Sequence, residues 1–137
     1  MDKVLNYLAL ARKAGKAELG EEPVGAAARA LHAHLIIVAA DASDHTWRRA
    51  KSFAAGTNQQ CVRLMQSKDD MGFAVGRQAL AIAAITDAGM ALAMVEALGQ
   101  PEKYKTVVEV LTEKAKRQRQ RQAEAKAHQR NVRKGKK

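Results

Sequence analysis

The residues that could do chemistry are few and lie mostly apart along the chain. His32 and His34 are two positions apart at the end of an expected helix, where this spacing turns them to different faces. No cluster of thiols or carboxylates accompanies them, so we expect neither a metal site nor a cofactor. Cys61 falls within an expected strand, where a small core residue is a simpler interpretation than a nucleophile.

Adjacent carboxylates occur at Glu21-Glu22 and at Asp69-Asp70, each near the start of an expected helix. They are more simply partners of the positive helix end than an acid/base pair. The scattered glycines form neither a Walker loop nor a dinucleotide fingerprint. We therefore expect no enzymatic activity.

Charge is the strongest signal in the sequence. The net charge is +10, and residues 1–99 hold 11 Lys and Arg against 10 Asp and Glu, whereas residues 100–137 hold 13 against 4. A nearly neutral part is thus followed by a basic extension, which predicts a polyanionic partner such as nucleic acid. A tail that only improves solubility is the alternative. The candidate RNA-binding cations of the tail are Lys114, Lys116, Arg117, Arg119 and Arg121.

The sequence lacks the features typical of membrane proteins, secreted proteins and disulfide-rich proteins. No apolar run approaches the ~20 residues of a membrane span, and the first residues lack the order of a signal peptide. A single cysteine allows no internal disulfide framework and fits a reducing compartment. We expect a cytoplasmic protein.

Apolar periodicity predicts alternating helices and strands. The expected helices cover about 2–14, 21–33, 44–55, 68–76 and 87–99, and the expected strands cover 17–19, 35–40, 61–65 and 80–85. Such alternation predicts an α/β fold, a three-layer α/β/α sandwich around a four-stranded mixed sheet. At Gly20 a strand gives way to a helix whose first N–H groups are unpaired, a suitable site for an anion.

The extension after Gly99 has a different pattern. Tyr104, Val107, Val108 and Leu111 form one apolar stripe, which predicts a helix that docks or pairs. Beyond Thr112 the stripe ends, and we expect a helical or disordered segment without a core face. The chain thus divides into a domain over 1–99 and a basic extension over 100–137, part helical and part disordered.

Three motifs resemble one known family. They are Leu8-Ala9-Leu10-Ala11-Arg12-Lys13-Ala14-Gly15-Lys16 with Gly20-Glu21-Glu22, Leu35-Ile36-Ile37-Val38-Ala39-Ala40-Asp41-Ala42-Ser43, and Ser67-Lys68 with Met71-Gly72-Phe73-Ala74-Val75-Gly76-Arg77. Together they resemble the ribosomal protein L-seven-Ae / L-thirty-e superfamily, most closely its bacterial YlxQ-type members. The resemblance covers residues 3 to about 95 and implies an α/β/α sandwich that binds RNA, in many members a kink-turn.

The resemblance also implies which residues face the RNA. Family members that bind kink-turns carry a pattern like Gly-x-Asn-Glu-x-x-Lys, and Gly20 matches its glycine. Glu22, Pro23 and Ala26 stand in place of the asparagine, glutamate and lysine. An ionised glutamate only accepts hydrogen bonds, so these departures weigh against standard kink-turn recognition.

Other positions match the family better. Lys68 matches a lysine beside the pocket for a flipped-out nucleotide, Trp47 falls at an apolar position of that pocket, and Arg77 lies in the RNA-facing loop. Trp47 could stack on a base or simply pack between helix and sheet. The predicted RNA-binding residues of the domain are Lys13, Lys16, Gly20, Glu21, Glu22, Trp47, Lys68, Gly76, Arg77 and Gln78.

Two functions remain in competition. The first is a non-catalytic RNA-binding protein that works with ribosomal or other structured RNA and possible ribosomal protein partners. The alternative is a protein-interaction module that docks a partner through the helix around Tyr104–Leu111, with a solubilising tail. The oligomeric state stays open.

Overall fold

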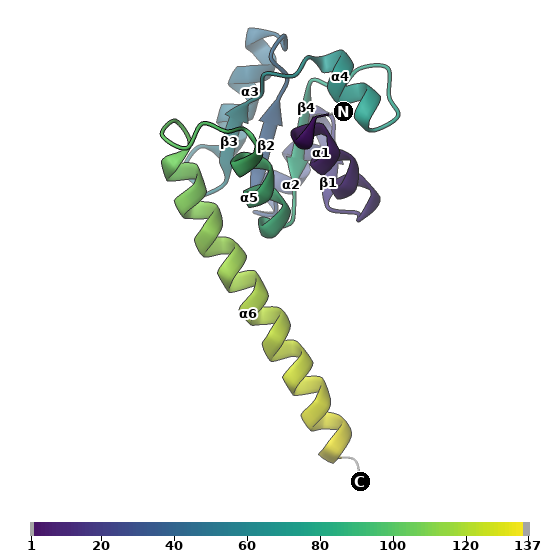
Figure 1. The fold of residues 1–137 in the computed structure, drawn as a ribbon, viewed down its shortest axis with the longest axis vertical. Coiled ribbons are helices and arrows are strands. Elements are labelled where there is room, and N and C mark those ends of the chain that lie inside the picture. Colours follow the sequence, from purple (N-terminus) through teal and green to yellow (C-terminus); the bar gives the residue numbers. More distant parts are fainter. Residues whose placement is uncertain (1, 136–137) are drawn as a thin grey trace.

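The predicted three-layer α/β/α sandwich is confirmed (Figure 1). The computed structural model describes residues 2–135 and the side chains of residues 2–130, so the last two residues of the predicted extension lie outside it. In chain order the elements are α1 (Lys3–Lys13), β1 (Ala17–Leu19), α2 (Glu21–Arg29), β2 (Leu35–Val38), α3 (Asp44–Ala54), β3 (Gln60–Arg63), α4 (Lys68–Ala74), β4 (Ile82–Ile85), α5 (Ala88–Ala97) and α6 (Lys105–Gly135).

The sheet is mixed, with strand order β1-β4-β2-β3. β4 runs antiparallel to both β1 and β2, while β2 and β3 are parallel. The order places β4, the last strand in the sequence, between the first two. The sheet therefore brings the end of β1, the end of β2 and the start of β4 together at one end of its strands, which we call the Gly20 edge.

Each face of the sheet covers its own core. Leu35 and Ile37 of β2 point to a core shared with α1, α4, α5 and α6, whereas Ile36 and Val38 point to a core shared with α2 and α3. All four side chains are fully buried. This explains the continuous apolar run of β2, because alternate side chains of a strand enter opposite faces of the sheet.

Capping residues place most helix starts where the sequence predicts them. The side chains of Asp2, Ser43, Ser67 and Asp87 each accept a hydrogen bond from a first-turn backbone N–H. These caps satisfy donors that a helix leaves unpaired.

The end of α2 differs from its predicted position. The sequence predicts a helix to about residue 33, but α2 ends at Arg29. Leu31 then adopts a left-handed conformation with φ 61°, and the N–H of His32 donates to the carbonyl of Ala27 at 2.9 Å. This is a helix ending that glycine usually provides, so its sequence signal is missing here.

The extension is a helix that shares the core of the sandwich. Leu111 and Ala115 of α6 are fully buried, and Tyr104 is 6% exposed, against α5 and its neighbours. The prediction of no core face beyond Thr112 is therefore wrong, because alanine contributes little to an apolar pattern yet permits close helix contact. In the stripe proposed to dock a protein partner, Tyr104 and Leu111 are buried within this chain, whereas Val107 and Val108 are half-buried.

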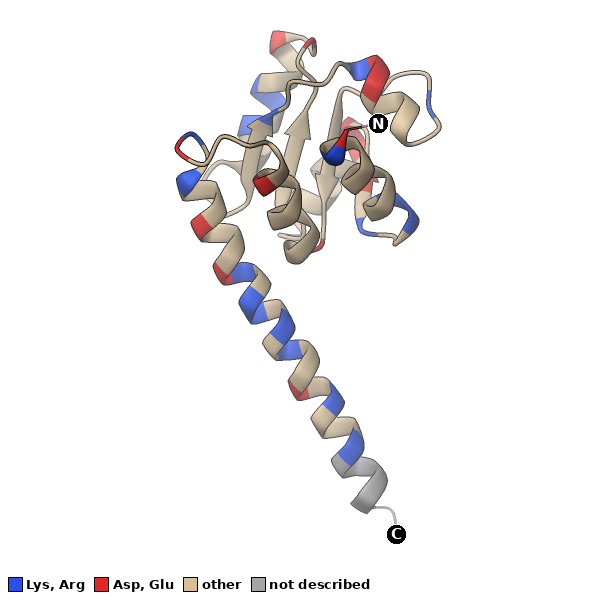
Figure 2. Ribbon diagram, in the orientation of Figure 1, with Lys and Arg blue, Asp and Glu red and all other residues tan. Residues whose placement is uncertain are grey.

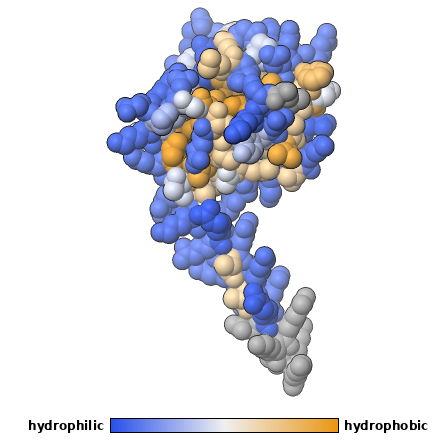
Figure 3. Space-filling view, in the orientation of Figure 1, coloured by the Kyte–Doolittle hydropathy of each residue, from blue (hydrophilic) through white to orange (hydrophobic). Residues whose placement is uncertain are grey.

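The rest of α6 leaves the sandwich. Every described side chain from Arg119 to Arg130 is exposed, where the sequence predicts disorder or fraying. The helix projects past the lower end of the sandwich in Figure 1, and Figure 3 shows it as mainly hydrophilic. In the part of the chain that the structure describes, no helix has the length and apolar character needed to cross a membrane.

Candidate nucleic-acid interface

Three loops meet at one edge of the sheet, at the upper end of the sandwich in Figure 1. The N–H of Gly20 donates to the carbonyl of Ile82 at 3.0 Å, which ties the start of α2 to the start of β4. The backbone N–H of Lys68 donates to the carboxylate of Asp41 at 2.8 Å, which ties α4 to the loop after β2. The N-terminal ends of α2, α3 and α4 therefore lie on the same side of the molecule.

Position 20 needs a glycine because of its backbone conformation, not because a side chain there would clash. Its φ is 95°, a value that residues with a Cβ rarely adopt. A Cβ added there would meet nothing closer than 3.9 Å, from Nη1 of Arg77 and Cδ of Pro23. The guanidinium of Arg77 thus lies beside the glycine, and the loop around Gly76 joins the start of α2 in one surface.

The loop that carries Arg77 is held tightly on α4. The N–H of Arg77 donates to the carbonyl of Gly72 at 2.8 Å. A Cβ on Gly72 would lie only 2.7 Å from Cα of Ala79, so the loop packs directly on the helix backbone. Gly76, with φ 73°, makes the turn. Arg77 and Gln78 are exposed, as is Lys68.

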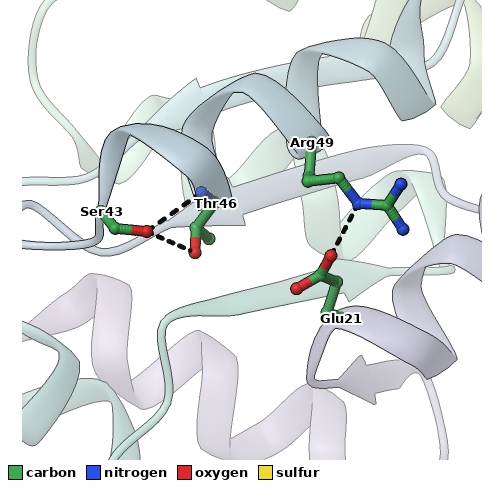
Figure 4. Close-up of polar contacts among 4 residues, drawn as sticks. All are labelled: Glu21, Ser43, Thr46 and Arg49. Carbon is green, nitrogen blue, oxygen red and sulfur yellow. Dashed lines mark hydrogen bonds and ion pairs between the residues drawn. The ribbon is translucent and has the colours of Figure 1, made fainter.

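Glu21 has a partner within the protein. Its carboxylate accepts a hydrogen bond from Nε of Arg49 at 2.6 Å, and Figure 4 shows Arg49 reaching across from α3. Arg49 also lies over the ring of Phe53, at 5.0 Å. Arg49 is not among the RNA-binding residues predicted from the sequence, although its spacing of four residues from Phe53 places both on one helix face. Glu22, in contrast, is exposed and forms no ion pair among the described residues.

Two predicted cations lie at the wrong edge for the Gly20 surface. The carbonyl of Lys16 accepts a hydrogen bond from the N–H of Thr86, which follows β4 at the opposite end of that strand from Ile82. Four residues of extended chain, about 13 Å, separate Lys16 from Gly20. Lys13 ends α1 and precedes this turn. The predicted grouping of both lysines around Gly20 is therefore wrong.

Trp47, like the two lysines, lies away from the Gly20 surface. It stands two residues before Arg49 on α3, a spacing that points the two side chains in nearly opposite directions. Trp47 packs partly on the second core, with Arg63 at 5.1 Å and Lys51 at 5.4 Å over its ring. It lines a groove of about 290 Å³ with Tyr104 among its other walls. Trp47 is thus half-buried in packing contacts, Lys68 is not among the residues that line its groove, and stacking of Trp47 on a base stays a prediction.

The groups considered for catalysis or metal binding lack suitable surroundings. Burial raises the pKa of the Cys61 thiol to about 12, with Lys51 opposing that shift. Such a thiol stays protonated at neutral pH and is a poor nucleophile. Among residues 2–135, no three His, Cys, Asp or Glu side chains are grouped to hold a metal ion.

The predicted cations of the tail divide between two sides of α6. Lys114, Arg117 and Arg121 turn toward the loop before β2, where they line one pocket. Lys116 and Arg119 are exposed and lie outside that pocket. Figure 2 shows basic residues along the coloured part of the projecting helix, which leaves the sandwich on the side away from α4. The tail and the Gly20 edge are thus separate surfaces.

Comparison with known proteins gives the fold but no family. Neither a family model nor a curated protein matches the sequence. A protein of unknown function from Bacillus halodurans C is 23% identical, with a TM-score of 0.68 over 73% of this chain and 100% of that one. The Giardia lamblia 15.5kD RNA binding protein is 20% identical, with a TM-score of 0.59 over 76% of this chain and 86% of that one. The chain therefore shares its α/β/α fold with both of these proteins.

Proposed function

We propose that this protein is a non-catalytic RNA-binding protein that acts with ribosomal RNA or another structured RNA. The observation that carries the proposal is the meeting of Gly20, Arg77 and Lys68 at one sheet edge. Both cations are exposed and form no ion pair within the described chain. The Giardia protein with the same fold is named as an RNA binding protein, and the net charge of +10 on this chain suits a polyanionic partner.

The mode of binding that we propose is shape recognition supported by phosphate contacts. Arg77 offers a planar fork that suits a phosphate, and Lys68 offers a point charge nearby. The loop packed on Gly72 would keep the backbone of Arg77 in position, so only its side chain would have to be ordered on binding. The exposed cations of α6 would add affinity that depends on salt and not on sequence. We also propose ribosomal proteins as partners of this chain.

Kink-turn recognition of the usual kind is not part of the proposal. Glu22 is an exposed carboxylate where kink-turn binders have an amide, and Ala26 offers no cation. Glu21 is engaged by Arg49. Backbone N–H groups at the start of α2 remain available to an RNA phosphate, but two carboxylates beside them would oppose it.

The test compares two double variants with the same change of charge. Lys68→Glu with Arg77→Glu alters the Gly20 edge, whereas Lys13→Glu with Lys16→Glu alters the opposite edge. Binding of fluorescent structured RNA at several salt concentrations should weaken by more than about tenfold for the first variant. It should weaken by less than about threefold for the second, through long-range charge alone. Equal losses would contradict a specific surface at Gly20.

The contribution of the tail needs a cut that spares the core. Removal of residues 119–137 leaves Leu111 and Ala115 in place, whereas a cut at residue 99 would uncover α5. We expect the shorter chain to bind RNA with a smaller dependence on salt, because fewer counterions are released. An unchanged salt slope would argue that the tail does not touch RNA.

A further inference from the structure

A polar pocket of about 260 Å³ lies at the root of the projecting helix, at the start of β2. This is the edge of the sheet opposite Gly20. The loop after α2 forms one wall and α6 forms the other. The lining residues are Leu31, His32, His34, Asn58, Lys114, Arg117, Gln118 and Arg121.

The helical wall presents one face of α6. Lys114, Arg117, Gln118 and Arg121 follow the spacing i, i+3, i+4 and i+7, which aligns their side chains along one side of a helix. Gln118 fixes this face against α5. Its amide donates to the carboxylate of Asp87 at 2.7 Å and its carbonyl accepts the N–H of Ala88 at 2.9 Å.

The cations of the pocket lack neutralising partners. Among the described residues, Lys114 and Arg121 form no ion pair, and Arg117 has only an exposed contact with Glu113 at 3.4 Å. The other oxygen of Asp87 caps α5, so this carboxylate is engaged on both sides. Three positive side chains thus line the pocket, and no carboxylate is among its lining residues.

His34 supplies a second, independent observation. Its Nδ1 atom is buried and has no hydrogen-bond partner in the described structure. Burial, followed by repulsion from Lys114, lowers the pKa of His34 while the Asp87 carboxylate opposes that shift, and burial lowers the pKa of Lys114. Buried polar atoms normally have a partner, and like charges rarely gather without a counter-ion. The three cations of the lining, with no carboxylate among the lining residues, are the observation that favours an anion in this pocket.

We propose that this pocket binds a phosphate group, carried by an RNA strand that runs along α6 or by a small phosphate compound. Arginine forks and a lysine ammonium are the groups that bind phosphate oxygens in proteins. The pocket is smaller than the ~300–1,000 Å³ typical for drug-sized ligands, which suits a single charged group. The proposal goes beyond the function at the Gly20 edge and does not depend on it.

Pyrophosphate is the probe for the first experiment. NMR titration of the full chain at constant ionic strength should shift the ring signals of His34 and the side-chain amide of Gln118, and it should raise the pKa of His34. Lys114→Gln with Arg121→Gln should weaken pyrophosphate binding at least about tenfold. The matched control is Lys116→Gln with Arg119→Gln, which removes the same charge from the exposed side of α6 and should leave binding unchanged. Equal effects of the two variants, or no shift at His34, would overturn the proposal.

A second titration with single-stranded RNA separates the two sources of the phosphate. Shifts at His34 caused by the RNA, which excess pyrophosphate replaces with the signal positions seen for pyrophosphate alone, would assign the pocket to an RNA backbone. Shifts confined to the Gly20 edge would assign it to a small phosphate compound. If pyrophosphate binds but RNA does not bind anywhere, the pocket stands and the proposed function fails. Thermal unfolding of each variant confirms that its fold is intact before binding is compared.

Discussion

The bridge made by Gln118 should be a main attachment of α6 to the sandwich, and Gln118→Ala removes it. The substitution leaves one oxygen of Asp87 and the N–H of Ala88 without their partners at 2.7 and 2.9 Å. It removes no buried apolar group, because the apolar contacts of α6 are made by Val107, Val108, Leu111 and Ala115. The change therefore isolates the polar part of the attachment.

The cost can be worked from these two hydrogen bonds. A bond to a charged group contributes about 1.5–3 kcal/mol and a neutral bond about 0.5–1.5 kcal/mol. Both sites are only partly buried, so water replaces part of the loss, and we expect about 1–3 kcal/mol in the free energy of unfolding. With a urea slope of about 2 kcal/mol per molar, the unfolding midpoint should fall by roughly 1 M.

Urea unfolding and amide hydrogen exchange are the assays. The amides of residues 105–118 should lose protection more than those of β2 and β4, because the helix is released locally. Gln120→Ala is the matched control, since Gln120 is exposed on the same helix and should change stability by less than about 0.5 kcal/mol. If both substitutions move the midpoint equally, the bridge does not hold α6 and the reasoning is refuted.

Three further predictions follow from single positions. Gly72→Ala should destabilise by about 1–2 kcal/mol in denaturant unfolding, because its Cβ would meet the Ala79 backbone at 2.7 Å, and this outweighs the ~1 kcal/mol that alanine adds to a helix. Leu31→Gly should raise stability by up to about 1 kcal/mol, since Leu31 is 63% exposed with φ 61°; a loss would show that its side chain matters more than its backbone. Because the pKa of His34 is lowered from 6.5 in the folded state, the unfolded state binds more protons, so stability should fall as pH drops through 6.5, and His34→Gln should flatten this dependence.

The fold could be predicted from the sequence because its signals are local. The three residues of β1 lie where predicted, and Ser67 and Asp87 cap the helices that they were expected to begin. The apolar run of β2 predicted a central strand, and it is central in the sheet. The predicted end of α2 is wrong because Leu31 adopts the left-handed backbone conformation that glycine usually adopts at a helix end.

The arrangement of the candidate sites was harder to predict. Lys16 and Gly20 are close in sequence, but the short strand between them runs alongside β4, so the two residues lie at opposite ends of that strand. The pocket at the root of α6 joins His34 to Lys114, eighty positions apart, which no local spacing reveals. The buried turn at Ala115 was missed because alanine gives only a weak apolar signal and charged residues flank it, Lys114 on one side and Lys116 on the other.

The strand order also bears on how the chain folds as it is synthesised. β1 pairs only with β4, so its residues 17–19 have no strand partner until residues 82–85 have left the ribosome. At about 5–20 residues per second, β1 waits several seconds, and closing so long a loop slows the pairing further. β2 and β3 can pair earlier, because Gln60 at the start of β3 follows Val38 by only 22 positions. A nascent chain stalled before β4 should therefore hold only the β2–β3 half of the sheet, open along the edge that β4 later fills.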